Sequence, residues 1–155
     1  MPLFYSTNAQ GLTTNATTAT ETDQLRTLTG TTRPANFIEV IGTARSNTVG
    51  GWTLRLRKFS TPSTVGSAIT PTPDDPGNQA ATITATTGPT AGSTATQIAS
   101  FGGSQVGAQI YWCAQELAQT PFTLNANGGA NGNLDVFSIA NGTSVPFDLG
   151  VKHFE

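Results

Sequence analysis

The sequence has few of the residues from which metal sites and most catalytic sites are built. It contains one cysteine, Cys113, and one histidine, His153, in 155 residues. A single chain can therefore form neither a disulfide framework nor a zinc site made of cysteines and histidines. Charged residues make up only 10% of the chain, and seven basic against nine acidic residues give no positive excess for binding nucleic acid. We expect no metal, no cofactor and no nucleic-acid partner.

Long apolar runs are also missing. No stretch approaches the roughly 20 apolar residues that a transmembrane helix needs. The first residues, Met1-Pro2-Leu3-Phe4-Tyr5, have neither the basic region nor the apolar core of a signal peptide. We therefore expect no membrane partner and a chain that stays in the cytoplasm until any assembly step.

Threonine, glycine and proline are abundant, with 28, 17 and 9 residues. Threonine and glycine are poor helix formers, whereas β-branched and aromatic residues favour strands. The clearest strand signal is Trp52-Thr53-Leu54-Arg55-Leu56-Arg57, in which apolar and polar residues alternate. Similar segments between turn residues predict about eight strands, at 22–28, 37–41, 52–57, 79–87, 96–101, 108–113, 134–140 and 145–154.

The spacing of the turn signals is typical of sandwiches and barrels. We predict an all-β fold, an antiparallel β-sandwich or jelly-roll-like single domain that covers residues 21–155. Segments 37–41 and 52–57 are expected to form a hairpin, and the last two strands to pair across Asn141-Gly142, a favoured hairpin turn. Segment 37–41 is apolar at nearly every position, which predicts that a neighbouring subunit covers one of its faces.

The first 20 residues differ from the rest. After Leu3-Phe4-Tyr5 they are mainly threonine, asparagine and alanine, with no apolar periodicity. Such a stretch cannot bury enough surface to offset the entropy of ordering it. We predict an extended N-terminal arm over residues 1–20 that is disordered or is ordered by a neighbouring subunit.

No constellation of catalytic residues is visible. His153 has no nucleophile or orienting carboxylate beside it in the sequence, so we expect a histidine at the surface or at an interface. Cys113 has no cationic neighbour that would lower its pKa, and is expected to be a small buried hydrophobe. Asp74-Asp75-Pro76-Gly77 is typical of a turn rather than of a calcium loop. No pair of acidic residues has a spacing that defines a geometry. We predict that the protein is not an enzyme.

The most distinctive charged feature is the cluster of Arg55, Arg57 and Lys58. It holds three of the seven basic residues, and the two arginines share the polar face of a predicted strand. Two interpretations remain open: a solvated face, or a docking patch for an acidic surface of a partner.

Several segments occur in an order that carries a family resemblance over about residues 20–155. They are Phe37-Ile38-Glu39-Val40-Ile41-Gly42, Trp52-Thr53-Leu54-Arg55-Leu56-Arg57, Ala68-Ile69-Thr70-Pro71-Thr72-Pro73-Asp74-Asp75-Pro76, Gly88-Pro89-Thr90-Ala91-Gly92 and the terminal Val151-Lys152-His153-Phe154-Glu155. In this order, along a threonine-rich and cysteine-poor chain, they resemble the small decoration (cement) proteins of tailed-phage heads. The resemblance extends more loosely to minor structural proteins of the same virions.

The resemblance implies a module that binds the outer surface of the capsid, commonly as a homotrimer. The expected partner is then the major capsid protein, and the expected location is the virion surface. We predict that docking uses the basic residues and the start of the arm: Arg55, Arg57, Lys58, Leu3, Phe4 and Tyr5. One alternative is a component of a phage tail, baseplate or fibre. Another is a carbohydrate-binding module in which Trp52, Tyr111 and Trp112 form a binding platform.

Overall fold

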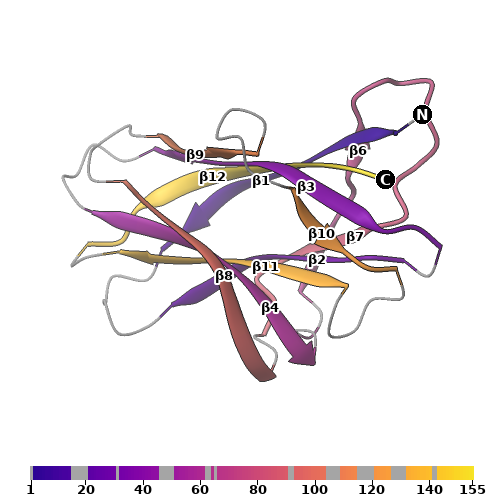
Figure 1. The fold of residues 1–155 in the computed structure, drawn as a ribbon. Helices are drawn as coiled ribbons and strands as arrows, with labels where there is room; N and C mark the ends of the chain where they lie inside the picture. Colours follow the sequence, from indigo (N-terminus) through magenta and orange to yellow (C-terminus); the bar gives the residue numbers. More distant parts are fainter. Residues whose placement is uncertain are drawn as a thin grey trace.

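The computed structural model describes residues 2–14, 21–30, 32–45, 51–61, 64, 66–90, 93–103, 109–114, 121–126, 132–140 and 143–155. Two antiparallel sheets face each other across one core, and the described residues contain no helix (Figure 1). The predicted all-β sandwich is confirmed.

Each sheet has six strands. Sheet A, the upper layer in Figure 1, contains β1 (Phe4–Thr13), β3 (Ala35–Ala44), β6 (Thr72–Pro73), β9 (Gln109–Cys113), β10 (Phe122–Leu124) and β12 (Pro146–Phe154). Sheet B, the lower layer, contains β2 (Thr22–Leu28), β4 (Trp52–Thr61), β5 (Ser67–Ile69), β7 (Thr84–Thr87), β8 (Ser93–Gly103) and β11 (Asn133–Ala140). The strand orders are β10-β3-β12-β1-β6, with β9 also beside β3, and β5-β7-β2-β11-β4-β8.

Eight of these strands have the connectivity of a jelly roll. When the short β5, β6, β7 and β10 are set aside, the sheets run β9-β3-β12-β1 and β2-β11-β4-β8. Strand β1 pairs with β12, β2 with β11, β3 with β9 and β4 with β8, so the chain pairs with itself from its ends inward. This is a long antiparallel hairpin rolled into two sheets, the arrangement of double-sheet jelly rolls.

Both predicted hairpins are wrong. Strands β3 and β4 follow each other in the chain but lie in opposite sheets, and so do β11 and β12. Turn residues reverse the direction of the chain, but they do not decide whether the next strand pairs with its predecessor or crosses to the other sheet. The long-range pairings β3–β12 and β4–β11 decide it here.

The predicted N-terminal arm is wrong for residues 4–13. They form β1, which lies between β12 and β6 and pairs with β12 from Phe4 opposite Phe154 to Thr13 opposite Pro146. The inward side chains of Tyr5, Thr7 and Ala9 are all buried. The sequence of this segment shows no clear alternation of apolar and polar residues, because two of its three inward positions are a threonine and an alanine. Residues 15–20 lie outside the described part of the chain.

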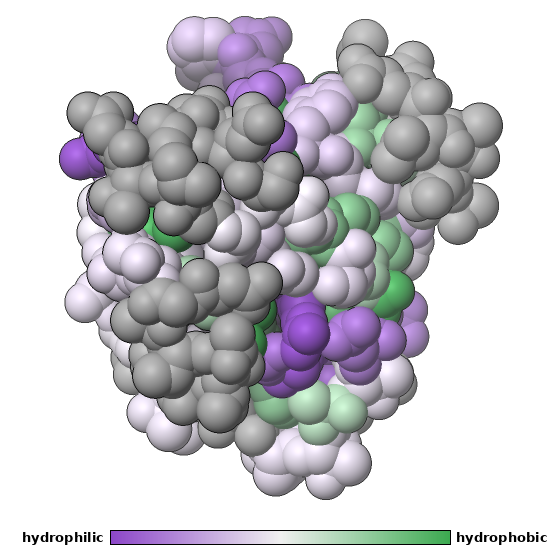
Figure 2. Space-filling model, turned by 90° about the vertical axis from the view of Figure 1, so that its left-hand side faces the viewer, coloured by the Kyte–Doolittle hydropathy of each residue, from purple (hydrophilic) through white to green (hydrophobic). Residues whose placement is uncertain are grey.

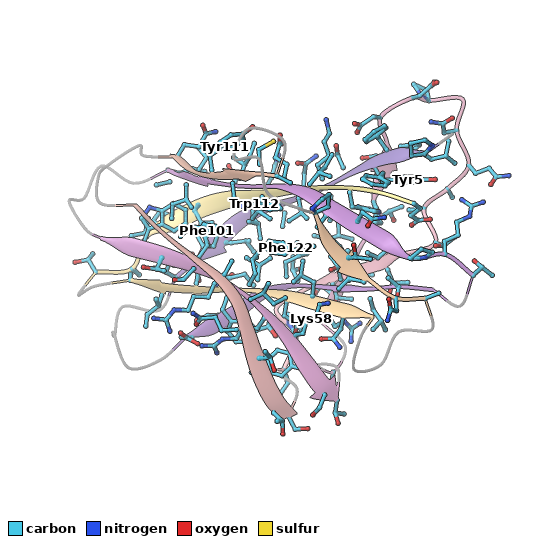
Figure 3. The ribbon with its side chains drawn as sticks, in the orientation of Figure 1. Tyr5, Lys58, Phe101, Tyr111, Trp112 and Phe122 are labelled. Atoms are coloured by element: carbon cyan, nitrogen blue, oxygen red, sulfur yellow. The ribbon has the colours of Figure 1, made fainter. Side chains whose placement is uncertain are left out.

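The core between the sheets is rich in aromatic rings. Trp52 packs against Phe147 with ring centroids 5.0 Å apart, and Trp112 stacks on Phe122 at 4.4 Å. Figure 3 shows Phe101, Trp112 and Phe122 between the two layers. Glycine is needed at position 42, because a Cβ there would lie 2.7 Å from side-chain atoms of both Leu54 and Trp52.

His153 is fully buried in this core, so its expected position at a surface or interface is wrong. Its ring stacks between Tyr5 and Phe37, with centroids 5.3 and 5.4 Å away. Burial lowers the pKa of His153, and the nearby Glu155 carboxylate only partly opposes this effect. The Glu155 side chain is held by the backbone N–H groups of Thr82 and Ile83. His153 therefore acts as an aromatic core residue near the C-terminus.

Candidate functional site

The outer face of sheet A carries the most distinctive surface of the described residues. Four strands present their outward side chains in rows, because paired residues of neighbouring strands share a face. One row runs Asn8, Gly150, Ile41 and Tyr111 from β1 through β12 and β3 to β9. The next row runs Ser6, Lys152, Glu39 and Cys113. Cys113 is thus half-buried on this outer face rather than in the core.

Two adjoining hollows mark this face. Gly150 has no side chain, which leaves a hollow of about 240 Å³ whose lining includes Asn8 and Ile41. A second hollow of about 520 Å³ lies beside it and shares Glu39 and Lys152 with the first. The second hollow is lined by Phe4, Ile38, Glu39, Asp74, Cys113, Lys152 and Phe154. Together they form a shallow groove across β1, β12 and β3.

Exposed aromatic side chains lie beside and within this groove. Among the residues that the structure describes, Phe4 and Tyr111 are the exposed large hydrophobic residues, at 40% and 39% exposure. The Phe4 ring packs against Phe154 with centroids 5.7 Å apart. Figure 3 shows Tyr111 above the upper sheet, on the side away from the core. Exposed apolar groups gathered on one face are typical of an interaction surface.

Two ion pairs within the chain lie around the groove, whereas Glu39, which lines both hollows, accepts a 3.5 Å hydrogen bond from the Tyr111 hydroxyl. Lys152 lies 3.0 Å from Asp74, which also accepts a 2.7 Å hydrogen bond from Ser6. Burial acts to raise the pKa of Asp74, but the bonds from Ser6 and Lys152 outweigh it and lower the pKa. Arg45 and Asp148 form another pair at 3.1 Å. A partner on this face would therefore meet aromatic groups, two ion pairs and the carboxylate of Glu39 rather than a strong field of one sign.

The predicted docking patch is divided by the fold. Alternation along β4 places Arg55 and Arg57 on the outer face of sheet B, where both guanidinium groups form ion pairs with Glu21. Lys58 points the other way and donates a 2.9 Å hydrogen bond from Nζ to the Thr123 carbonyl oxygen of β10. Burial lowers the pKa of this lysine. The three basic side chains do not form one surface.

The N-terminal docking residues are also divided. Tyr5 is fully buried, so it cannot contact a partner and its predicted docking role is wrong. Leu3 is half-buried, and its backbone exchanges two hydrogen bonds with Glu155. Phe4, in contrast, lies on the groove of sheet A. Of the residues predicted at the start of the chain, only Phe4 presents an exposed large side chain.

The outer face of sheet B also holds a buried charge cluster that was not predicted from the sequence. Asp135 of β11 is paired across the strands with Arg26 of β2 and Arg57 of β4. Asp23 hydrogen-bonds to Asp135, and burial together with the Asp135 charge raises the pKa of Asp23 to about 9. Asp23 and Asp135 therefore share one proton at neutral pH rather than both being charged. No sequence spacing signals this acidic pair, because the β2–β11 pairing creates it.

On the face of the molecule that Figure 2 shows, strongly hydrophilic residues lie in a few clusters, and much of the described surface there is pale or hydrophobic. The predicted platform of Trp52, Tyr111 and Trp112 is wrong for both tryptophans, which are buried.

Within the described ranges, no three His, Cys, Asp or Glu side chains are placed to hold a metal ion. The same ranges contain no helix with the length and apolarity of a membrane span.

Comparison of the chain with known proteins gives no further assignment. No protein-family model and no curated protein sequence matches it.

Proposed function

We propose that the protein is a virion structural protein that decorates the outer surface of a phage head and stabilises the shell by binding the major capsid protein. The exposed aromatic groove on sheet A is the observation that carries this proposal. The sequence resemblance to decoration proteins and the jelly-roll connectivity, which recurs in viral capsid proteins and in lectins, support it. A shared fold does not by itself imply a shared function, so the proposed role rests on the groove.

Docking in this proposal uses the outer face of sheet A, with Phe4 and Tyr111 as its aromatic anchors. Aromatic side chains that enter a partner's pockets supply a large share of the energy of an interface. Arg55 and Arg57 are not needed, because Glu21 already pairs with both. The protein acts through binding alone, without catalysis or a cofactor. Many copies on a repeated lattice can reinforce a shell even when each contact is weak.

Replacing both anchors, Phe4→Ser with Tyr111→Ser, should reduce binding to capsids by at least about tenfold, since each truncated interface anchor typically costs more than about 1 kcal/mol. The measurement is co-sedimentation of the purified protein with undecorated capsids over a range of protein concentrations. Thermal unfolding of the double variant serves as the check that the fold is intact, because both rings are partly exposed already.

The matched control is Arg55→Gln with Arg57→Gln, which alters the opposite sheet. We expect this variant to bind capsids like the wild type. If the arginine variant loses binding while the aromatic variant keeps it, docking occurs through sheet B. If the wild-type protein sediments with purified tails and not with capsids, the tail, baseplate or fibre alternative replaces decoration.

Carbohydrate binding is the second candidate function, and the hollow over Gly150 is the observation that favours it. Its lining combines an amide, hydroxyls, carboxylates and an ammonium group around the apolar Ile41, and Tyr111 stands next to Ile41 in the same row. Such mixed donors and acceptors suit a hydroxyl-rich ligand. Glycan-array binding that disappears in Tyr111→Ser, without any binding to capsids, would favour this candidate.

A further inference from the structure

Strand β8 is a long edge strand, with one side unpaired by any strand of the described residues. It spans eleven residues, Ser93–Gly103, and stands at the end of sheet B, where β4 is its one hydrogen-bonded neighbour among the described strands. In Figure 1 it forms the front edge of the lower layer and extends with β4 below the sandwich. Residues 93–97 along it are all exposed. A free edge presents a row of backbone N–H and C=O groups that can pair with another strand.

The other described edges of the two sheets are short. Sheet B ends in the three-residue β5, and sheet A ends in the two-residue β6, which contains Pro73. The opposite side of sheet A is divided between β9 and β10, of five and three residues. Short edge strands and proline are devices that prevent pairing between proteins. Strand β8 therefore stands out as the long edge among the described residues.

The sequence of β8 lacks most of the features that block edge pairing. It contains no charged residue and no proline. Its protection is limited to a bulge near Ile98 and to Thr94, whose positive φ of 54° interrupts a regular strand. At the other end Gly103 lies against Ile110 of β9. Between these two ends lies Ala95 to Phe101, in which the regular parts on either side of the bulge are available for pairing.

We propose that β8 pairs antiparallel with β8 of a second copy of this chain, across a two-fold axis, so that sheet B continues from one subunit into the other. An antiparallel pair of identical strands is self-complementary, as an isologous interface requires. A strand without charges places no like charges opposite each other in such a pair. A single strand pair covers less area than a standard interface, so the association in solution is weak and depends on concentration.

The pairing gives a dimer, whereas the resemblance to decoration proteins implies a trimer. The inference does not rest on the proposed function, because β8 is an edge of the described sheet B whatever the groove on sheet A binds.

A cysteine scan along β8 tests the pairing directly. Single cysteines replace Ala95, Thr96, Gln97, Ala99 or Ser100 in a Cys113→Ser background, and the proteins are oxidised at high concentration. Residues directly opposite each other have Cβ atoms about 4.5–5.5 Å apart, so crosslinking should peak next to the axis at about ten times the yield of distant positions. The control is Thr84→Cys, an exposed residue on the internal strand β7.

Light scattering of the wild type provides a readout that does not depend on the substitutions. The expected mass rises with concentration from 16.0 kDa toward twice that value. A flat crosslinking profile at the level of the Thr84→Cys control would overturn the proposal. So would a mass that stays at 16.0 kDa at millimolar concentration, or one that reaches three times this value without a peak in the scan.

Discussion

Deletion of residues 2–13 should leave the protein unable to fold. The deletion removes β1, an internal strand of sheet A, and leaves the long strand β12 without its neighbour on one side. It also removes the buried ring of Tyr5, which stacks on His153. Truncating one buried aromatic side chain costs about 3–5 kcal/mol, and the whole domain has only about 5–15 kcal/mol of stability. Losing the entire strand exceeds that margin.

Circular dichroism and thermal unfolding of the purified deletion variant provide the measurement. We expect no cooperative transition, and recovery mainly in the insoluble fraction because the freed edge of β12 can pair with other molecules. Phe4→Ser is the matched control, since it changes the same strand at a side chain that is 40% exposed. That variant should unfold cooperatively within a few degrees of the wild type. A deletion variant that unfolds like the full chain would show that residues 2–13 are a dispensable arm.

Replacing Asp23 with asparagine should remove a loss of stability that the wild type shows as the pH rises. The pKa of Asp23 is about 9 in the folded protein and near 3.8 when the chain is unfolded. Between these values the folded state holds one proton more than the unfolded state. The free energy of unfolding therefore falls with increasing pH, by up to about 1.4 kcal/mol per pH unit.

Burial and the charges around Asp23 explain why its pKa is raised. Burial contributes most to the raised pKa, followed by the charge and the hydrogen bond of Asp135, while Arg26 and Arg57 act in the opposite sense. Glu21, the partner of Arg57, adds a further acidic group to the same face. An asparagine at position 23 imitates the protonated carboxyl without titrating, so it keeps a donor for Asp135.

Urea unfolding at pH 5, 7 and 8 measures this effect as the difference in stability between Asp23→Asn and the wild type. The difference should grow in favour of the variant as the pH rises. The lowered pKa of His153 has the opposite effect, because it makes the free energy of unfolding fall as the pH drops near and below 6.5. Both proteins carry His153, so this effect cancels when they are compared at the same pH. Asp75→Asn, at an exposed turn, is the control and should follow the wild type. Parallel pH profiles for Asp23→Asn and the wild type would contradict a shared proton at Asp23 and Asp135.

Local sequence patterns were sufficient to predict the fold class. Alternation over residues 52–57, for example, identified the strand that the structure shows as β4, Trp52–Thr61, and turn residues separated such strands. They could not predict β1, because its inward positions include Thr7 and Ala9, which give little apolar periodicity. They also could not predict which sheet each strand joins. That choice depends on pairings between distant strands such as β3 with β12.

The candidate surfaces depended even more on the fold. Phe4 was predicted as a docking residue, but as part of an arm rather than as part of a groove on sheet A. Arg55, Arg57 and Lys58 were grouped by their proximity in sequence, although alternation along a strand places Lys58 on the other face. The groove itself joins residues from four strands, and Asp23 meets Asp135 only through strand pairing. Contacts between strands that are distant in the sequence leave no pattern in any local segment.

Cryo-electron microscopy of the intact phage tests the proposed function most directly. The account predicts that the protein covers the outside of the head in many tens to hundreds of copies, with β1, β12, β3 and β9 facing the major capsid protein and Phe4 and Tyr111 in the contact. Density for the jelly roll only in the tail, baseplate or fibres, in a few copies, would contradict it. So would copies on the head that turn sheet A toward the solvent.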